Sequence, residues 1–128
     1  MENLFIERTR NTPLINFDCT TGIMKIVGRS IPESAHDFWH PVADWIIQYS
    51  QQPRRHTVLK VQLEYVNTSS SKYFLDVFKL FEKIHREPDE NTVAVEWYYE
   101  EYDEDMMEMG EDFKSILRLP FDIKILPE

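Results

Sequence analysis

The sequence predicts a single α/β domain, spanning residues 1–128, in which helices pack against a mixed β-sheet. The chain has 128 residues, a length that fits one domain with roughly two-thirds of its unfolded surface buried. Segments with apolar residues at every second position alternate along the chain with segments in which apolar residues recur at helical spacing. A hairpin followed by this alternation predicts parallel strands linked by right-handed helical crossovers.

The first part of the chain predicts a hairpin and a helix. Residues 14–17 and 23–27 are typical of short strands, and the Thr-Thr-Gly sequence at 20–22 forms the turn between them. Residues 33–49 predict a helix, in which Pro41 should cause a kink or a broken start because it has no backbone N–H to donate. The apolar face of this helix is expected to carry Phe38, Val42, Trp45, Ile46 and Tyr49.

The remaining elements are expected in the order strand, helix, turn, strand, helix and strand. Their expected bounds are 58–65, 69–85, 88–91, 93–99, 103–117 and 121–125. The side chains expected inward are Val58, Leu59, Val61, Leu63 and Tyr65 in the first of these strands and Met106, Met109, Phe113 and Ile116 in the last helix. Polar residues such as Lys60 and Gln62 alternate with apolar ones, which predicts that one face of the sheet is only partly covered.

Composition and charge exclude several classes of function. The net charge of −9 argues against a nucleic-acid partner, which would need a basic patch. The chain has 3 glycines and no glycine-rich phosphate loop, so no nucleotide cofactor is expected. Cys19 is the single cysteine, which favours a reducing, cytoplasmic location and a small half-buried residue rather than an activated thiolate. No apolar run approaches the roughly 20 residues that span a membrane, and no signal peptide is apparent.

The most informative segment joins the strand that ends near residue 65 to the helix that follows it. It reads Asn67, Thr68, Ser69, Ser70 and Ser71, five residues whose side-chain oxygens can cap a helix. One cap needs one such residue, so this segment has more hydroxyl groups than capping requires. Because a helix N-terminus favours negative charge, it can hold a phosphate. The segment therefore suggests a phosphoacceptor site, with simple capping and turn chemistry as the alternative.

Two histidines one helical turn apart raise the question of a zinc site. A metalloprotease motif needs a Glu directly after the first histidine and a third ligand elsewhere. Here Asp37 follows His36, Pro41 follows His40, and no further ligand stands out. We therefore expect no metal site and no catalytic residues, and a small metal-dependent hydrolase is the alternative from another functional class.

An acidic segment covers residues 100–112, with eight Asp and Glu residues and no Lys or Arg. Acidic residues at a helix start are favoured by the helix dipole, so a solvated acidic face is one interpretation. The other is a docking surface for a basic patch on a partner. In the adjoining strand, alternation sends Trp97 and Tyr99 toward the core and leaves Tyr98 as a candidate for partner binding.

Several motifs together resemble the SiaC family of regulatory phosphoproteins. The matching segments are Gly28-Arg29-Ser30-Ile31-Pro32-Glu33, residues 63–72, Trp97-Tyr98-Tyr99, Asp103-Glu104-Asp105-Met106, Gly110-Glu111-Asp112-Phe113 and Leu119-Pro120-Phe121. The resemblance runs from about residue 12 to residue 125. It implies a fold similar to STAS domains, the anti-sigma-factor-antagonist fold of partner-switching systems. It also implies phosphorylation by a cognate Ser/Thr kinase and dephosphorylation by a metal-dependent Ser/Thr phosphatase.

The resemblance also implies a function and residue roles. In the system that gave the family its name, the unphosphorylated protein binds and activates a diguanylate cyclase, so we expect a non-enzymatic switch in cyclic-di-GMP signalling and biofilm formation. Thr68 matches the family's phosphoacceptor position, and Asn67, Ser69 and Ser70 would position the turn or contact partners. Apart from the resemblance, the position of Lys72 one turn along the helix makes it a candidate for partner binding that would offset a phosphate charge, with a solvated surface lysine as the alternative. A switch that acts on a transcription regulator is the alternative.

Two residues depart from the family's pattern. Ile31 stands where members often have Tyr, and Ser34 where Asn is usual. Both positions lie near the first expected helix, so the departures bear on the identity of the partner more than on the fold.

Overall fold

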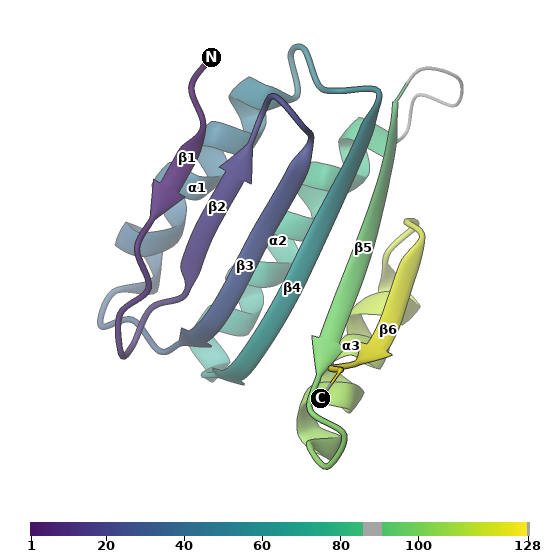
Figure 1. Ribbon diagram of the computed structural model, residues 1–128. Coiled ribbons are helices and arrows are strands. Elements are labelled where there is room, and N and C mark those ends of the chain that lie inside the picture. The colour runs from purple at the N-terminus through teal and green to yellow at the C-terminus, as the bar shows by residue number, and fades with distance from the viewer. Residues whose placement is uncertain (86–90, 128) are drawn as a thin grey trace.

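The computed structural model describes residues 1–85 and 91–127. These residues form six strands and three helices (Figure 1). In chain order they are β1 (Leu4–Ile6), β2 (Leu14–Asp18), β3 (Ile23–Ser30), α1 (Ala35–Tyr49), β4 (His56–Val66), α2 (Thr68–His85), β5 (Thr92–Tyr99), α3 (Glu104–Ile116) and β6 (Phe121–Ile125). The predicted mixed α/β fold is confirmed. Most of the predicted turn at 88–91 lies outside the described residues.

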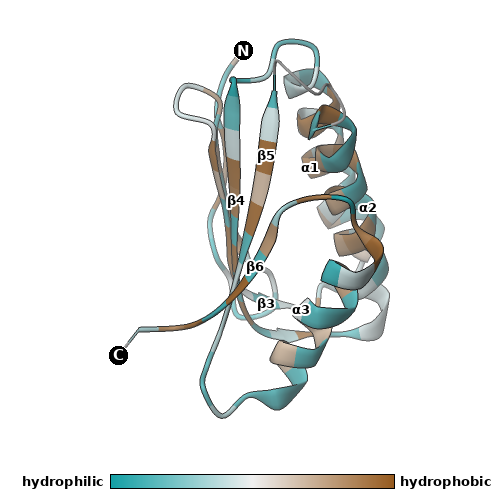
Figure 2. Cartoon of the chain, turned by 90° about the vertical axis from the view of Figure 1, so that its right-hand side faces the viewer, coloured by the Kyte–Doolittle hydropathy of each residue, from teal (hydrophilic) through white to brown (hydrophobic). Residues whose placement is uncertain are grey.

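All the strands belong to one sheet, in which each strand pairs with the next along the chain. β1, β2 and β3 are antiparallel, whereas β3 to β6 are parallel. Right-handed crossovers that always step in the same direction put every helix on the same face. Figure 2 shows this arrangement, with α1, α2 and α3 on one side of the sheet and the C-terminal segment leaving on the other. The prediction of a partly covered sheet is therefore confirmed.

Aromatic side chains from all three helices fill the space between the helices and the sheet. Trp39 of α1 packs edge-on against Phe74 of α2, with ring centroids 4.7 Å apart. The ring of Phe78, also on α2, packs against Phe113 of α3 and Trp97 of β5, with ring centroids 5.0 Å and 6.3 Å apart. These aromatic side chains, all buried, join the three helices to the sheet in one core.

Helix α3 approaches the sheet closely because it has a glycine where it crosses Trp97. A Cβ atom on Gly110 would lie 2.6 Å from Cδ1 of the Trp97 ring, closer than two carbon atoms can approach. The Trp97 indole N–H donates a hydrogen bond of 3.0 Å to the Met106 carbonyl, which also belongs to α3. Gly110 is therefore required for packing, although glycine weakens a helix interior.

The helix starts differ in detail from the prediction. Helix α1 begins at Ala35, two residues later than expected, and Ser34 caps it by accepting a hydrogen bond from the Asp37 N–H. Helix α1 continues without a break through Pro41, so the expected broken start is absent. Strand β1 was not predicted, because three residues are too few to show a pattern.

None of the helices in the described residues has the length and apolar character that a membrane-spanning segment needs.

Three side chains expected in the core lie elsewhere. Val58 alternates with the buried Thr57 and Leu59, so it is half-buried on the open face of the sheet. Tyr65 is 50% exposed because the pairing of β3 with β4 shifts at this point: Gly28 pairs with Leu63, but Arg29 pairs with Tyr65. Glu64 is the extra residue of a β-bulge, which reverses the alternation at the end of β4. Ile116 is 54% exposed because α3 ends there and Leu117 takes the buried position.

Candidate functional site

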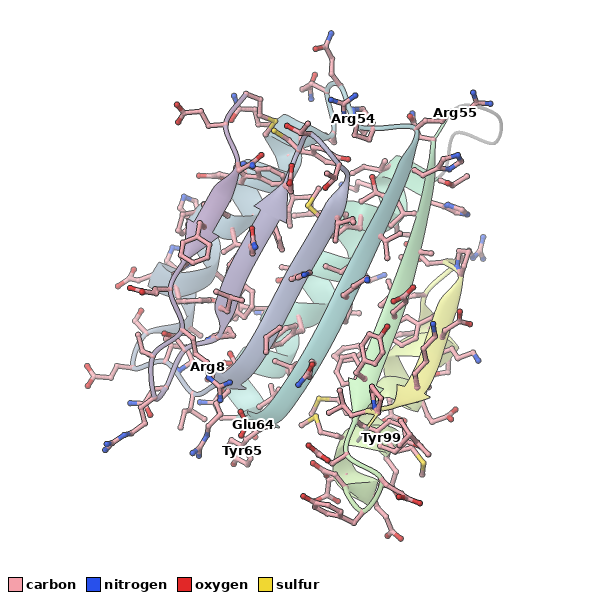
Figure 3. All side chains as sticks on the ribbon, in the orientation of Figure 1. Arg8, Arg54, Arg55, Glu64, Tyr65 and Tyr99 are labelled. Atoms are coloured by element: carbon pink, nitrogen blue, oxygen red, sulfur yellow. The ribbon has the colours of Figure 1, made fainter. Side chains whose placement is uncertain are left out.

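The candidate site is the start of α2, at the edge of the sheet where the parallel strands end. Strand β4 passes through its bulge and runs into the helix after a single residue, Asn67. The Asn67 N–H donates a hydrogen bond of 3.0 Å to the carbonyl of Ser30 at the end of β3. On the open side of the sheet, Arg8 forms an ion pair with Glu64, and Tyr65 lies beside them (Figure 3). The hydrogen bond to Ser30 thus ties the residue before α2 to the end of β3, and the ion pair lies on the opposite face of the sheet.

The cap of this helix is Asn67. Its side-chain carbonyl accepts hydrogen bonds from the Ser70 N–H at 2.9 Å and from the Ser69 hydroxyl at 3.3 Å. Its backbone carbonyl accepts from the N–H groups of Ser70 and Ser71, both at 3.1 Å. These are the bonds of a helix N-cap. Thr68 is therefore the first helical residue and not the cap.

The Thr68 hydroxyl is left free by this arrangement. The residue is exposed, and its side chain makes no hydrogen bond within residues 1–85 and 91–127. The first turn of α2 carries no acidic side chain, while Lys83 and His85 lie in its last turn. The positive end of the helix dipole is therefore not offset by a carboxylate in that turn, which favours an added negative group there.

The neighbouring hydroxyl groups have different surroundings. Ser69 is exposed and Ser71 is half-buried, with its hydroxyl donating to the Thr68 carbonyl at 2.8 Å. Ser70 is fully buried, and its hydroxyl has no partner among the described residues. A buried side chain offers a partner no surface, so in this conformation Ser70 shapes the turn through its backbone N–H and does not contact a partner.

Lys72 lies one helical turn after Thr68 on the same side of α2 and is exposed. It forms no ion pair within the described part of the chain. A phosphate on Thr68 would therefore lie within one turn of an uncommitted ammonium group. Thr68, Asn67, Ser69 and Lys72 are the predicted site residues that the structure brings together with accessible side chains.

Tyr98 is not part of this group. Side chains along β5 point to alternate faces of the sheet. Because Trp97 is buried on the helix side, the side chain of Tyr98 lies on the open face, away from α2. Its hydroxyl donates a hydrogen bond of 2.6 Å to Glu96, and this hydrogen bond raises the pKa of Tyr98. Lys124 lies 6.0 Å from the ring centroid. Tyr98 thus belongs to a separate surface.

The other candidate features have simple structural surroundings. The rings of His36 and His40 stack with centroids 5.2 Å apart, and His40 lies 3.3 Å from Asp44. Among the described residues no three His, Cys, Asp or Glu side chains come together as a metal site would require. Asp103 caps α3 by accepting a hydrogen bond of 3.1 Å from the Met106 N–H, so part of the acidic segment has a local role.

One feature of the site could not be read from the sequence. A groove of about 510 Å³ runs between α2 and α3 and begins at Ser71 and Lys72. Leu75 lines it from α2 and Met109 from α3. The sequence indicated that each is apolar, but not that the helices that carry them leave a space between them.

The fold and the helix start define a class: small mixed α/β proteins that present a helix N-terminus with a free hydroxyl at the edge of the sheet. The model of the family described as "SiaC family regulatory phosphoprotein" matches residues 6–126. The chain therefore belongs to the SiaC family of regulatory phosphoproteins, as the sequence motifs indicated.

The relatives come from Pseudomonas aeruginosa. An uncharacterized protein of strain UCBPP-PA14 is 32% identical over 124 residues, which cover 97% of each chain. The crystal structure of apo-SiaC matches with a TM-score of 0.87 and 31% identity, covering 97% of this chain and 99% of that one. A second crystal structure contains the diguanylate cyclase SiaD in complex with its activator SiaC. The SiaC chain of this structure matches with a TM-score of 0.88 and 31% identity, covering 96% of this chain and 99% of that one.

Proposed function

We propose that this protein is a non-catalytic, single-domain switch whose unphosphorylated form binds and activates a diguanylate cyclase. Membership of the SiaC family supports the regulatory role. The relative of known structure that is described as the activator of SiaD has the same fold over nearly its whole length. This likeness favours a cyclase over a transcription regulator as the effector. The protein would act in the cytoplasm, where cyclic-di-GMP signalling takes place.

The main support for the proposal is that two different residues cap α2 and offer a free hydroxyl at its start. Because Asn67 caps the helix, the Thr68 hydroxyl is exposed and unengaged in the described part of the chain. A kinase can therefore modify Thr68 without removing a bond that the fold needs. A metal-dependent phosphatase would reverse the modification.

A phosphate on Thr68 would change the surface but not the fold. It adds a charge of about −1.5 to −2 and three acceptor oxygens. The helix N-terminus tolerates this charge, so we expect the domain to stay folded. An apolar or hydrogen-bonded interface over Thr68 would have to desolvate the phosphate, which weakens binding. A basic partner patch would instead bind the phosphate better, so charge alone does not fix the direction; the family resemblance favours the unphosphorylated form as the active one.

The site of modification is tested by incubating the protein with its cognate kinase and ATP and measuring intact mass. One phosphate should be added, and fragmentation should map it to Thr68. Thr68→Ala should remove the modification, whereas Ser69→Ala, the matched control beside it, should not. A phosphate mapped to Ser69 or Ser71 would refute the assignment.

The switch is tested with the diguanylate cyclase encoded closest to this protein's gene. The unmodified protein should bind it in titration calorimetry and raise its rate of cyclic-di-GMP synthesis, and phosphorylation should weaken binding by at least about tenfold. Thr68→Glu should imitate the phosphate only in part, because one carboxylate has less charge and fewer acceptors. Equal or tighter binding by the phosphorylated form, with an unchanged circular dichroism spectrum, would refute this direction of switching.

A further inference from the structure

The groove between α2 and α3 has an apolar floor. Helix α2 packs along α1 and on β5, whereas α3 packs on β4, β5 and β6, and a space separates the two helices on the same face of the sheet (Figure 1). Leu75, Met109 and Phe113 line the groove. Leu75 and Met109 are half-buried and pack against the core, and Phe113 is buried. The helix layer is thus incomplete at this point.

One wall of the groove is acidic. Asp105, Glu108 and Asp112 of α3 line it at a spacing of three or four residues, which places them on one side of the helix. All are exposed, and none forms an ion pair with a described residue. Like charges at this spacing repel one another and destabilise a helix slightly. A positively charged group opposite these three carboxylates would relieve this repulsion. The α2 wall carries no acidic lining residue; Ser71 and Lys72 line it together with Leu75.

We propose that this groove receives an amphipathic helix of the effector, with apolar residues on the groove floor and Lys or Arg residues facing α3. The inference rests on the proposed function and names the surface and the chemistry of the partner. A space bounded by two helices, with an apolar floor, suits the binding of a third helix through residues at helical spacing. The acidic wall complements a basic side of that helix and speeds its association.

The groove also explains how phosphorylation weakens binding. Thr68 precedes Lys72 by one turn, so a phosphate on Thr68 lies at the end of the groove on the α2 wall. The basic residues of the docked helix face α3 on the other wall. The phosphate therefore meets the uncharged side of the partner and must lose water without gaining a cation from it. Lys72 can pair with the phosphate, which removes a side chain from the α2 wall.

The charge of the groove is tested by a matched pair of reversals on α3. Glu108 lines the groove, whereas Glu111 is equally exposed on the same helix but does not line it. Glu108→Lys should weaken binding of the cyclase encoded closest to the gene by at least about tenfold, and Glu111→Lys should change it by less than about twofold. Both variants change the net charge equally, so a general charge effect would move both.

The floor of the groove is tested by a second pair. Met109→Gln places a polar side chain in the groove, and Ile116→Gln makes a similar change at an exposed position of α3 outside it. The first should weaken binding and the second should not. Circular dichroism and the urea midpoint of each variant show that loss of binding does not come from unfolding.

The occupant is identified with a photo-crosslinking amino acid at position 109, followed by sequencing of the crosslinked peptide. We expect an amphipathic, Lys- or Arg-rich helical segment of the cyclase. If wild-type protein binds the cyclase but the groove variants bind equally well, or the peptide is acidic, this inference is wrong and the proposed function stands. If wild-type protein does not bind the cyclase, both are wrong.

Discussion

The two sides of helix α2 differ in how completely they are covered. On the side toward α1, Phe74 is fully buried and its ring packs edge-on against Trp39. On the side toward α3, Leu75 is half-buried and lines an open groove together with the exposed Lys72, which follows the exposed Thr68 by one turn. One helix thus has a side that is buried in the core and a side that is open to solvent.

The largest expected effect comes from adjacent residues on these two sides. Phe74→Ala should lower the free energy of unfolding by about 3–5 kcal/mol, because it leaves a cavity in the aromatic core. Leu75→Ala should lower it by about 1 kcal/mol, because its side chain is only partly removed from water in the folded state. Urea unfolding followed by circular dichroism measures both. Equal losses would contradict the difference between the two sides.

Gly110→Ala should have the next largest effect, by changing how α3 lies. Alanine favours a helix over glycine by about 1 kcal/mol. The added Cβ would overlap the buried ring of Trp97, and such overpacking costs about 1–3 kcal/mol. We expect a net loss of about 1 kcal/mol in urea unfolding, with a shift in tryptophan fluorescence. Lys114→Ala, exposed on the same helix, is the control. A more stable Gly110→Ala variant would show that α3 can move away freely.

The next comparison distinguishes the helix cap, Asn67, from the proposed phosphoacceptor, Thr68. Asn67→Ala removes the acceptor of the Ser70 N–H and should cost about 1 kcal/mol of stability. Thr68→Ala removes an exposed hydroxyl and should cost less than about 0.5 kcal/mol. Both values follow from the midpoints of urea unfolding, provided that the variants share the same dependence of the unfolding free energy on urea concentration. A Thr68→Ala cost as large as that of Asn67→Ala would mean that Thr68 also holds the helix start.

The smallest effect is expected at Ser70, the buried hydroxyl of the same turn. Its oxygen has no partner among the described residues, so Ser70→Ala removes a buried polar group that gains no protein hydrogen bond. We expect stability to change by less than about 0.5 kcal/mol or to increase. Thermal unfolding compared with that of Ser69→Ala checks this. A loss greater than about 1 kcal/mol would contradict it.

The order and type of nearly all elements followed from local patterns. Alternation indicated β4 and β5, and helical spacing indicated α1, α2 and α3, because each period reflects the geometry of one element. The misses had several causes: the three residues of β1 show no pattern, α3 ends at Ile116, and elsewhere a neighbouring element intervened. The bulge at Glu64 turned Tyr65 outward, and the close approach of α3 to Trp97 depends on Gly110, which has no distinctive local pattern.

The features of the candidate site also separate into those that local patterns predict and those that depend on distant segments. Composition and local spacing are enough to place a run of Asn, Thr and Ser at the start of α2 and an acidic segment at the start of α3. Folding then makes Asn67 the cap, leaves the Thr68 side chain exposed and buries Ser70. It also brings Leu75 and Met109 to a common groove. Burial and hydrogen-bond partners depend on which distant segments the sheet brings together, and a local pattern does not contain that information.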